Sequence, residues 1–193
     1  MGLRIERIMQ TIKKSSTITY EIKKSKFIAH LIPISEFKGF QDKLRNEHPK
    51  SRHVVYALRY INEFDQIVEN SSDDGEPKGS SAPPALNVLR GEEMINVAVL
   101  IVRYFGGVKL GIGGLVRAYG NSVKEVLSSS NNIVLYEKML KYSFLTTYSQ
   151  VQRTEYLLKK LKIYNMEREF LGNGVEWKIE LTEEKLEKFK GEM

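Results

Sequence analysis

The stretch INVAVLIVRYFGGVKLGIGGLVRAYGNSVKEVL, residues 95–127, determines the fold that we expect for this chain. Residues 95–105 are nearly all apolar, which is typical of a β-strand buried on both faces of a sheet. Between residues 115 and 127 apolar side chains recur at helical spacing, which predicts an amphipathic helix. A glycine-rich loop joins the two, so a buried strand is expected to lead through this loop into a helix N-terminus.

Glycines and basic residues alternate in this loop. A glycine cluster loses much backbone entropy when it is ordered, so it needs a structural or functional reason. The pattern matches neither the P-loop nor the dinucleotide-binding fingerprint. The helix N-terminus could hold an anion, but the spacing alone favours a loop that crosses close to neighbouring backbone. The glycines are Gly106, Gly107, Gly111, Gly113 and Gly114, and the basic residues are Arg103, Lys109 and Arg117.

The segment SSDDGEPKGSSAPPAL, residues 71–86, is rich in turn residues and carries a cluster of carboxylates. Asp73, Asp74 and Glu76 surround Gly75, and carboxylates so placed could bind a hard cation such as Mg²⁺. The spacing of an EF-hand is absent, so a solvated turn is favoured over a metal site. The third interpretation is that these carboxylates form ion pairs with Arg103 or Arg117, and that the ion pairs order the loop.

The remaining pattern predicts two domains that mix helices with strands, residues 1–137 and 138–193. The second has the order β-α-β-β-α, which is ferredoxin-like but stops before its last strand. The first is expected to contain strands at 15–22, 26–34, 53–60, 66–70 and 133–137, and helices from Ser35 to Glu47 and from Ser81 to Gly91. The second is expected to contain strands at 138–148, 162–170 and 175–181, and helices capped by Ser149 and Thr182.

The composition is that of a globular protein: 193 residues, of which 41% are hydrophobic and 28% are charged. Cysteine is absent, which excludes disulfides and a cysteine nucleophile and fits a cytoplasmic location. The pattern contains no secretory signal and no membrane-spanning run, so no membrane partner is expected. The net charge of +6 comes chiefly from residues 1–60. That basic flank could attract a polyanion such as RNA, or it could be solvated surface.

The three histidines, His30, His48 and His53, are scattered and lack the spacing of a zinc site. No nucleophile-elbow pattern accompanies the serines. His53 lies on a predicted strand, where it is either a packed, hydrogen-bonded residue or a candidate acid or base. We therefore predict no catalytic residue, no metal and no cofactor, and keep His53 as a candidate site residue.

Four segments of the chain resemble the YigZ/IMPACT family. They are KSKFIAHLIPI at 24–34, SRHVVYALR at 51–59, SSDDGEPKG at 71–79 and RYFGGVKLGIGGLVRAY at 103–119. The resemblance covers residues 9–136, and the remainder looks like the small C-terminal domain of the bacterial members. It implies an α+β protein. The first domain would be like the second domain of ribosomal protein S5, and the second would be ferredoxin-like, as in the last domain of the ribosomal translocase.

Three features depart from the family's pattern. The family usually has Gly-Thr-Ala-Gly after the acidic loop, whereas this chain has Gly79, Ser80, Ser81 and Ala82. Ser80 keeps the hydroxyl, but a role that requires bare backbone at Ala82 would be lost. The chain also reaches Met193 before a clear last strand, and residues 1–8 precede the usual start.

The resemblance implies a role in translation. Eukaryotic relatives compete for the activator of a starvation-responsive kinase, and RNA binding is the usual inference for bacterial members. We therefore expect a non-catalytic regulator that binds RNA, the ribosome or a protein partner. A protein-interaction module that regulates a stress-response pathway, as in the eukaryotic relatives, is one alternative. An enzyme that acts on a phosphorylated or peptide substrate through Glu76 or His53 is the other. Arg103, Lys109, Arg117 and the five glycines would face the anion, opposite Asp73, Asp74, Gly75, Glu76 and Ser80.

Overall fold

The computed structural model describes residues 8–193, and the chain divides into two compact units. One unit ends at Tyr136 and the other spans Glu137–Met193. Most of the expected upstream extension, residues 1–8, lies outside the described residues. None of the helices within residues 8–193 is long and apolar enough to cross a membrane.

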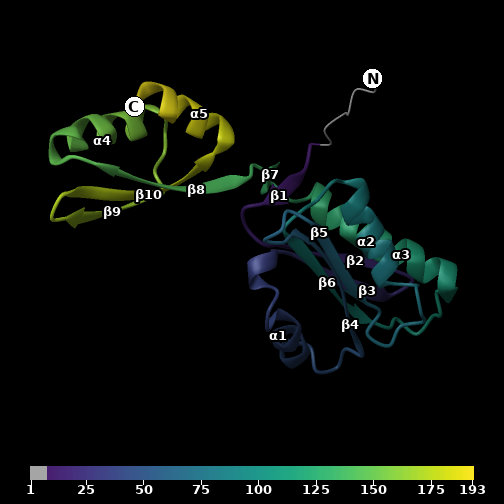
Figure 1. Ribbon diagram of the computed structural model, residues 1–193. Coiled ribbons are helices and arrows are strands. Elements are labelled where there is room, and N and C mark those ends of the chain that lie inside the picture. The colour runs from purple at the N-terminus through teal and green to yellow at the C-terminus, as the bar shows by residue number, and fades with distance from the viewer. Residues whose placement is uncertain (1–7) are drawn as a thin grey trace, which may run out of the picture. The chain divides into compact units, whose positions relative to one another are not determined.

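The first unit is built on a five-stranded antiparallel sheet with the order β2-β3-β6-β4-β5 (Figure 1). The central strand β6 is buried on both faces from Val97 to Val102, which confirms the prediction from its apolar sequence. The strands β3 and β4 pair with its two edges, and neither of its faces is exposed to water. The strands are β2 (Ser16–Ile22), β3 (Ser25–Pro33), β4 (His53–Ile61), β5 (Ile67–Ser72) and β6 (Val97–Tyr104).

Helices cover the two faces of this sheet unequally. The helices α2 (Ala82–Gly91) and α3 (Gly111–Ser128) pack on one face, and the short helix α1 (Phe40–Glu47) packs on the other (Figure 1). Tyr119 of α3 is fully buried against Phe27 of β3. Their rings lie edge to face, with the ring centres 5.0 Å apart. A small ribbon of β1 (Gln10–Ile12) and β7 (Ile133–Leu135) completes the unit.

Two predicted helix starts were wrong in the first unit. The helix expected from Ser35 is a 3-10 turn, Ile34–Glu36, followed by α1, because Gly39 has a φ of +82° and interrupts the helical backbone. The helix expected from Leu115 begins one turn earlier, at Gly111. Gly111, Gly113 and Gly114 therefore belong to the first turn of α3 rather than to a loop.

The second unit has the expected order β-α-β-β-α, with a three-stranded antiparallel sheet in the order β8-β10-β9. The side chain of Trp177 on β10 is fully buried in its core, and the indole Nε1 donates to Thr146 Oγ1 at 2.9 Å. The prediction that Ser149 caps α4 was wrong: Gln150 is the N-cap residue, and Thr147 and Gln150 form a capping box on the 3-10 turn Tyr148–Gln150 that precedes the helix. The elements are β8 (Met139–Thr146), α4 (Val151–Lys160), β9 (Met166–Leu171), β10 (Gly174–Thr182) and α5 (Glu183–Glu192).

Candidate functional site

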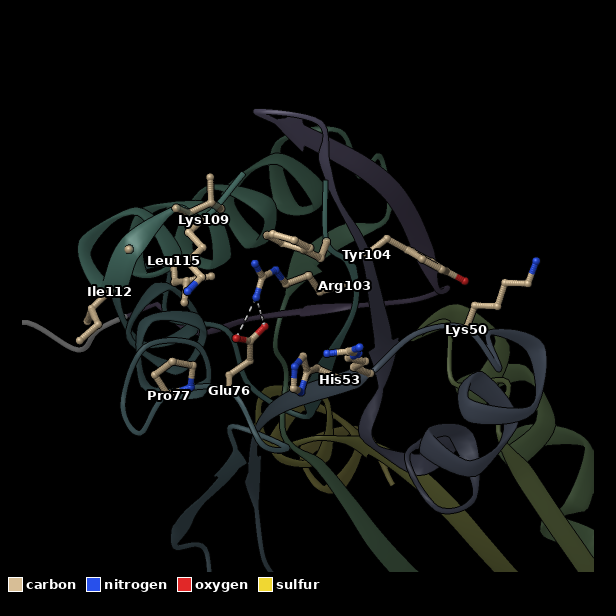
Figure 2. Close-up of a pocket in the computed structure, with 13 residues that line it drawn as sticks. Lys50, His53, Glu76, Pro77, Arg103, Tyr104, Lys109, Ile112 and Leu115 are labelled. Carbon is tan, nitrogen blue, oxygen red and sulfur yellow. Dashed lines mark hydrogen bonds and ion pairs between the residues drawn. The ribbon is translucent and has the colours of Figure 1, made fainter. Parts of the chain in front are cut away.

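A pocket of about 670 Å³ opens in the first unit where β6 leads into the glycine stretch (Figure 2). Its walls come from the end of β6, the segment before β4, the acidic loop (residues 73–76) and the first turn of α3. Four lining residues are cationic, and Glu76 is the one carboxylate among the described residues that line it. The lining residues are Lys50, Arg52, His53, Glu76, Pro77, Arg103, Tyr104, Phe105, Lys109, Leu110, Gly111, Ile112 and Leu115.

Arg103 and Glu76 form an ion pair at the floor of this pocket. Arg103 Nη1 donates to both Glu76 oxygens, at 2.6 Å and 2.9 Å, and Tyr119 Oη donates to Glu76 Oε1 at 2.7 Å. The Glu76 side chain is only 2% exposed and that of Arg103 is 10% exposed. Burial, followed by the negative charge of Glu76, raises the pKa of Tyr119. The ion-paired interpretation of the acidic loop is therefore correct for Glu76.

Part of the Arg103 guanidinium has no protein acceptor. Both of its ion-pair bonds use Nη1, and its Nε is buried without a hydrogen-bond partner among residues 8–193. The guanidinium carbon lies 5.7 Å from the ring centre of Phe27 and 5.9 Å from that of Phe105. These rings and Glu76 hold the guanidinium in place, so its remaining N–H groups are fixed beside the pocket.

Asp73 does not line the pocket and instead caps helix α2. Its Oδ1 accepts from Ser81 N, Ser81 Oγ and Ala82 N, and its Oδ2 accepts from Gly79 N at 2.7 Å. Burial alone would raise the pKa of Asp73, but these hydrogen bonds outweigh it and the pKa is lowered. The predicted cap residue Ser81 makes no side-chain cap of its own, because its hydroxyl donates to Asp73.

Asp74 orders the start of β4. Its Oδ2 accepts from Val54 N at 2.6 Å, and its Oδ1 forms an ion pair with Arg45 of α1. Its carbonyl oxygen lies 2.8 Å from His53 Nδ1, which must carry the proton because a carbonyl can only accept. His53 is thus fixed by the acidic loop, as the hydrogen-bonded interpretation expects, and it lines the pocket beside Glu76 (Figure 2).

The three carboxylates of the acidic loop point in different directions. Asp73 faces α2, Asp74 faces β4 and α1, and Glu76 faces Arg103 and Tyr119. Accordingly, no group of three His, Cys, Asp or Glu side chains within residues 8–193 is arranged to hold a metal ion.

The glycines of the stretch serve different purposes. A Cβ at Gly106 would lie 2.0 Å from the backbone carbon of Lys24, so this position requires a bare backbone. Gly107 and Gly111 have φ values of +86° and +70°, a conformation that glycine adopts without strain. Gly113 is exposed in the first turn of α3. Only Gly111 among these glycines lines the pocket.

The basic residues of the stretch also separate. Lys109 is exposed, lines the pocket and has no carboxylate partner among the described residues. Arg117 is exposed on α3 with its guanidinium beside Gly113, and it does not line the pocket. Ser80 is buried and donates to the Pro77 carbonyl at 2.6 Å. Ala82 is buried in the core as the first residue of α2, so the methyl group is accommodated where the family usually has glycine.

Four residues that the sequence analysis did not select complete the site. Lys50 and Arg52 line the pocket from the basic run before β4, and that run was the available signal. Phe105 is 58% exposed at the rim, directly after the apolar strand. Tyr119 lies in the apolar stripe of α3, where nothing in the sequence marks its hydroxyl as the partner of Glu76.

These features define a class of protein: a helix-covered antiparallel sheet carrying a basic pocket between an acidic loop and a glycine-rich helix start. A family model for the Impact N-terminal domain matches residues 23–127. The chain belongs to the IMPACT family, which confirms the resemblance drawn from its motifs.

Relatives match along most of the chain. An IMPACT family member of Haemophilus influenzae is 32% identical over 184 residues, covering 94% of this chain and 88% of the relative. The IMPACT family member YvyE of Bacillus subtilis is 34% identical over 203 residues, covering 95% and 91%. A crystal structure of a hypothetical protein aligns with a TM-score of 0.67 at 29% identity, over 95% of this chain and 89% of that one.

Proposed function

We propose that this chain is a non-catalytic, translation-linked regulator of the cytoplasm that binds RNA, alone or on the ribosome, through the basic pocket. The observation that carries the proposal is the charge of the pocket. Lys50, Arg52 and Lys109 face it without carboxylate partners among residues 8–193, while Glu76 is already neutralised by Arg103. Unpaired cations around a concave surface attract the phosphate backbone of a nucleic acid.

The domain folds belong to the same proposal. The β-α-β-β-α order and the β8-β10-β9 sheet of the second unit support a ferredoxin-like domain at residues 138–193. Family membership supports a domain like the second domain of ribosomal protein S5 at residues 1–137. Two such domains in series would give a translation-linked binding protein. A measurement of RNA binding by the full chain does not depend on these fold assignments.

A salt titration tests RNA binding. The full chain is titrated with a fluorescent RNA hairpin at several NaCl concentrations, and affinity should fall linearly with salt on logarithmic axes. Each of Arg52→Gln and Lys109→Gln should reduce the slope by about 0.7–0.9, because one phosphate contact is lost. Lys124→Gln, which removes a charge from the far end of α3, is the matched control and should leave the slope unchanged. Absence of binding at low salt would refute the proposal.

An interaction with a protein is the second candidate. The rim of the glycine stretch exposes three large apolar side chains, Phe105, Val108 and Ile112, and such patches are typical of protein interfaces. Affinity purification with and without nuclease separates the two candidates. A partner protein that is retained after nuclease treatment, and lost on Ile112→Ser, would favour this second function.

The geometry weakens the enzyme alternative. Both Glu76 oxygens already accept hydrogen bonds from Arg103, and one also accepts from Tyr119, so this carboxylate is held as a buried ion-pair partner. His53 keeps only Nε2 for other contacts, because Nδ1 donates to the Asp74 carbonyl. We therefore retain binding rather than catalysis as the proposed function.

A further inference from the structure

The floor of the basic pocket carries hydrogen-bond donors that have no protein acceptor. Arg103 Nε is buried without a partner, and Nη2 makes no hydrogen bond to the described residues. The neighbouring helix α3 is 18 residues long, and no side chain caps its N-terminus. The first-turn N–H groups from Gly111 onward are therefore available beside Arg103, together with the positive end of the helix dipole.

We propose that this floor binds the terminal phosphate of an RNA strand, a phosphate monoester, in preference to an internal phosphodiester. The inference rests on the proposed function, because it specifies which part of an RNA enters the same pocket. Arg103 and Lys109 would pair with the phosphate oxygens, and the first turn of α3 would donate backbone N–H groups to them.

The depth of the donors selects a terminal group. The Arg103 side chain is 10% exposed and Glu76 below it is 2% exposed, so an anion must enter the pocket to reach them. An internal phosphodiester offers two free oxygens, and its strand continues on both sides. A terminal monoester offers three free oxygens and only one attached strand. The terminal group can therefore reach the floor while the rest of the strand leaves through the mouth.

The charge of the floor also fits a monoester. The only lining carboxylate among the described residues, Glu76, is compensated by Arg103 and by the Tyr119 hydroxyl. Lys109 then adds an uncompensated positive charge at the wall. A phosphate monoester carries a charge of about −1.5 to −2 at pH 7, because its second pKa is about 6. A phosphodiester carries only one negative charge, so the monoester gains more from the same donors.

The rim favours a nucleotide over a phosphorylated peptide. Phe105 is 58% exposed, with its ring centre 5.9 Å from the Arg103 guanidinium carbon, and Ile112 lines the same pocket and is 67% exposed. Figure 2 shows Ile112 across the pocket from Arg103. An exposed aromatic ring beside a phosphate site can stack on the first base, which contributes about 1–3 kcal/mol per base in single-strand binding proteins. Lys50 and Arg52 extend the positive charge from the mouth of the pocket for the following phosphates.

Binding of matched oligonucleotides to the full chain tests the inference. One short single-stranded RNA is prepared with a 5′-phosphate, with a 3′-phosphate or with hydroxyl groups at both ends. We expect a terminal phosphate to tighten binding at least tenfold at pH 7.5 and this gain to shrink below pH 6. Equal affinities for all three RNAs would overturn the inference and leave RNA binding intact, whereas failure of every RNA to bind would overturn both.

Variants locate the effect. Arg103→Lys keeps a cation for Glu76 but leaves no guanidinium N–H for a ligand, so it should abolish the gain from the terminal phosphate. Because this residue is buried, the melting temperature is measured first. Lys109→Gln on the exposed wall should also reduce the gain and does not threaten the fold. Lys124→Gln is the matched control and should preserve the gain. A gain unchanged by both pocket variants would overturn the assignment.

Two competitors identify the source of the phosphate. Adenosine monophosphate and a phosphoserine peptide are added to the complex with the terminally phosphorylated RNA. We expect each to compete at least tenfold more weakly than the unlabelled RNA, because neither supplies both the terminal phosphate and the following strand. Equal competition by the mononucleotide would overturn the assignment to RNA in favour of a free nucleotide, and stronger competition by the peptide would overturn it in favour of a phosphoprotein.

Discussion

Replacement of Asp73 by alanine tests whether the acidic loop holds helix α2 in place. The carboxylate accepts four hydrogen bonds, from the backbone N–H groups of Gly79, Ser81 and Ala82 and from the Ser81 hydroxyl. Two of these N–H groups lie at the start of α2, where no intrahelical acceptor exists. The alanine variant therefore leaves the helix start and the preceding turn without their shared acceptor.

The size of the effect follows from these bonds. Loss of an N-cap costs about 0.5–2 kcal/mol, and a hydrogen bond to a charged group contributes about 1.5–3 kcal/mol. The Asp73 side chain is partly exposed, so water will replace some of the lost bonds. We therefore expect a net loss of roughly 2–3 kcal/mol in the free energy of unfolding. With a urea slope of about 2 kcal/mol/M, the midpoint should fall by about 1–1.5 M.

Urea unfolding followed by far-UV circular dichroism measures this shift. Trp177, the single tryptophan, lies in the second unit, so its fluorescence reports on the unfolding of that unit separately. Glu63→Ala is the matched control, since it removes an exposed carboxylate from a turn without a cap. If the midpoint of Asp73→Ala stays within about 0.3 M of the wild-type value, equivalent to about 0.6 kcal/mol, the capping argument is refuted.

The difference in the free energy of unfolding between wild type and Asp73→Ala should also depend on pH. The pKa of Asp73 is lowered in the fold, so the folded state binds this proton less readily than the unfolded state. The stabilisation is complete above the unfolded value of about 3.9 and disappears as the pH falls through the lowered folded value. The difference between wild type and Asp73→Ala should therefore be full at pH 7 and shrink below about pH 4. A difference that grows on acidification would contradict the assignment.

Three further predictions concern the first unit. Gly106→Ala should lower the free energy of unfolding by about 1–3 kcal/mol, measured by thermal unfolding, because the new Cβ would overlap the backbone of Lys24. Gly91→Ala is the control and should not destabilise the unit, because a Cβ there meets no atom within 4 Å. Tyr119→Phe should cost about 1.5–3 kcal/mol by removing the 2.7 Å hydrogen bond to buried Glu76, and an unchanged urea midpoint would disprove it. Burial, then the charge of a neighbouring histidine, lowers the pKa of His30 to about 4. Stability should therefore fall as the pH drops from about 6.5 towards that value, and His30→Asn should flatten this dependence.

Patterns within one element were predictable from the sequence. The apolar run of β6 and the helical spacing of α3 depend only on neighbouring residues. The strand was found where expected, and α3 contains the expected residues but begins one turn earlier. The first residue of each helix was harder to predict, because backbone geometry decides it. Gly39 interrupts the predicted first helix through its positive φ, so α1 begins only at Phe40. Gly111, Gly113 and Gly114 belong to α3 despite their low helix propensity.

Contacts between distant elements were not predictable in the same way. Glu76 meets Arg103 27 residues later and Tyr119 43 residues later, and only the placement of β6 and α3 in the fold brings them together. An ion pair between the acidic loop and Arg103 was one interpretation of the sequence pattern, but that pattern did not favour it over a solvated turn. Charge alone is insufficient, since Arg117 has the same charge and lies outside the pocket. Burial decided the outcome, because a buried carboxylate requires a partner.

The glycine stretch shows why a tight connection and an anion site are compatible. Gly106 packs against the backbone of Lys24, and its N–H donates to the buried Ser25 hydroxyl at 3.1 Å, which anchors the end of β6 to the turn before β3. The chain then turns at Gly107 and Gly111 through positive φ values, which a residue with a Cβ adopts only with strain. These constraints fix the position at which α3 begins, beside Arg103. The packing glycines thus determine where the free N–H groups of the helix point, and the binding proposal depends on that packing.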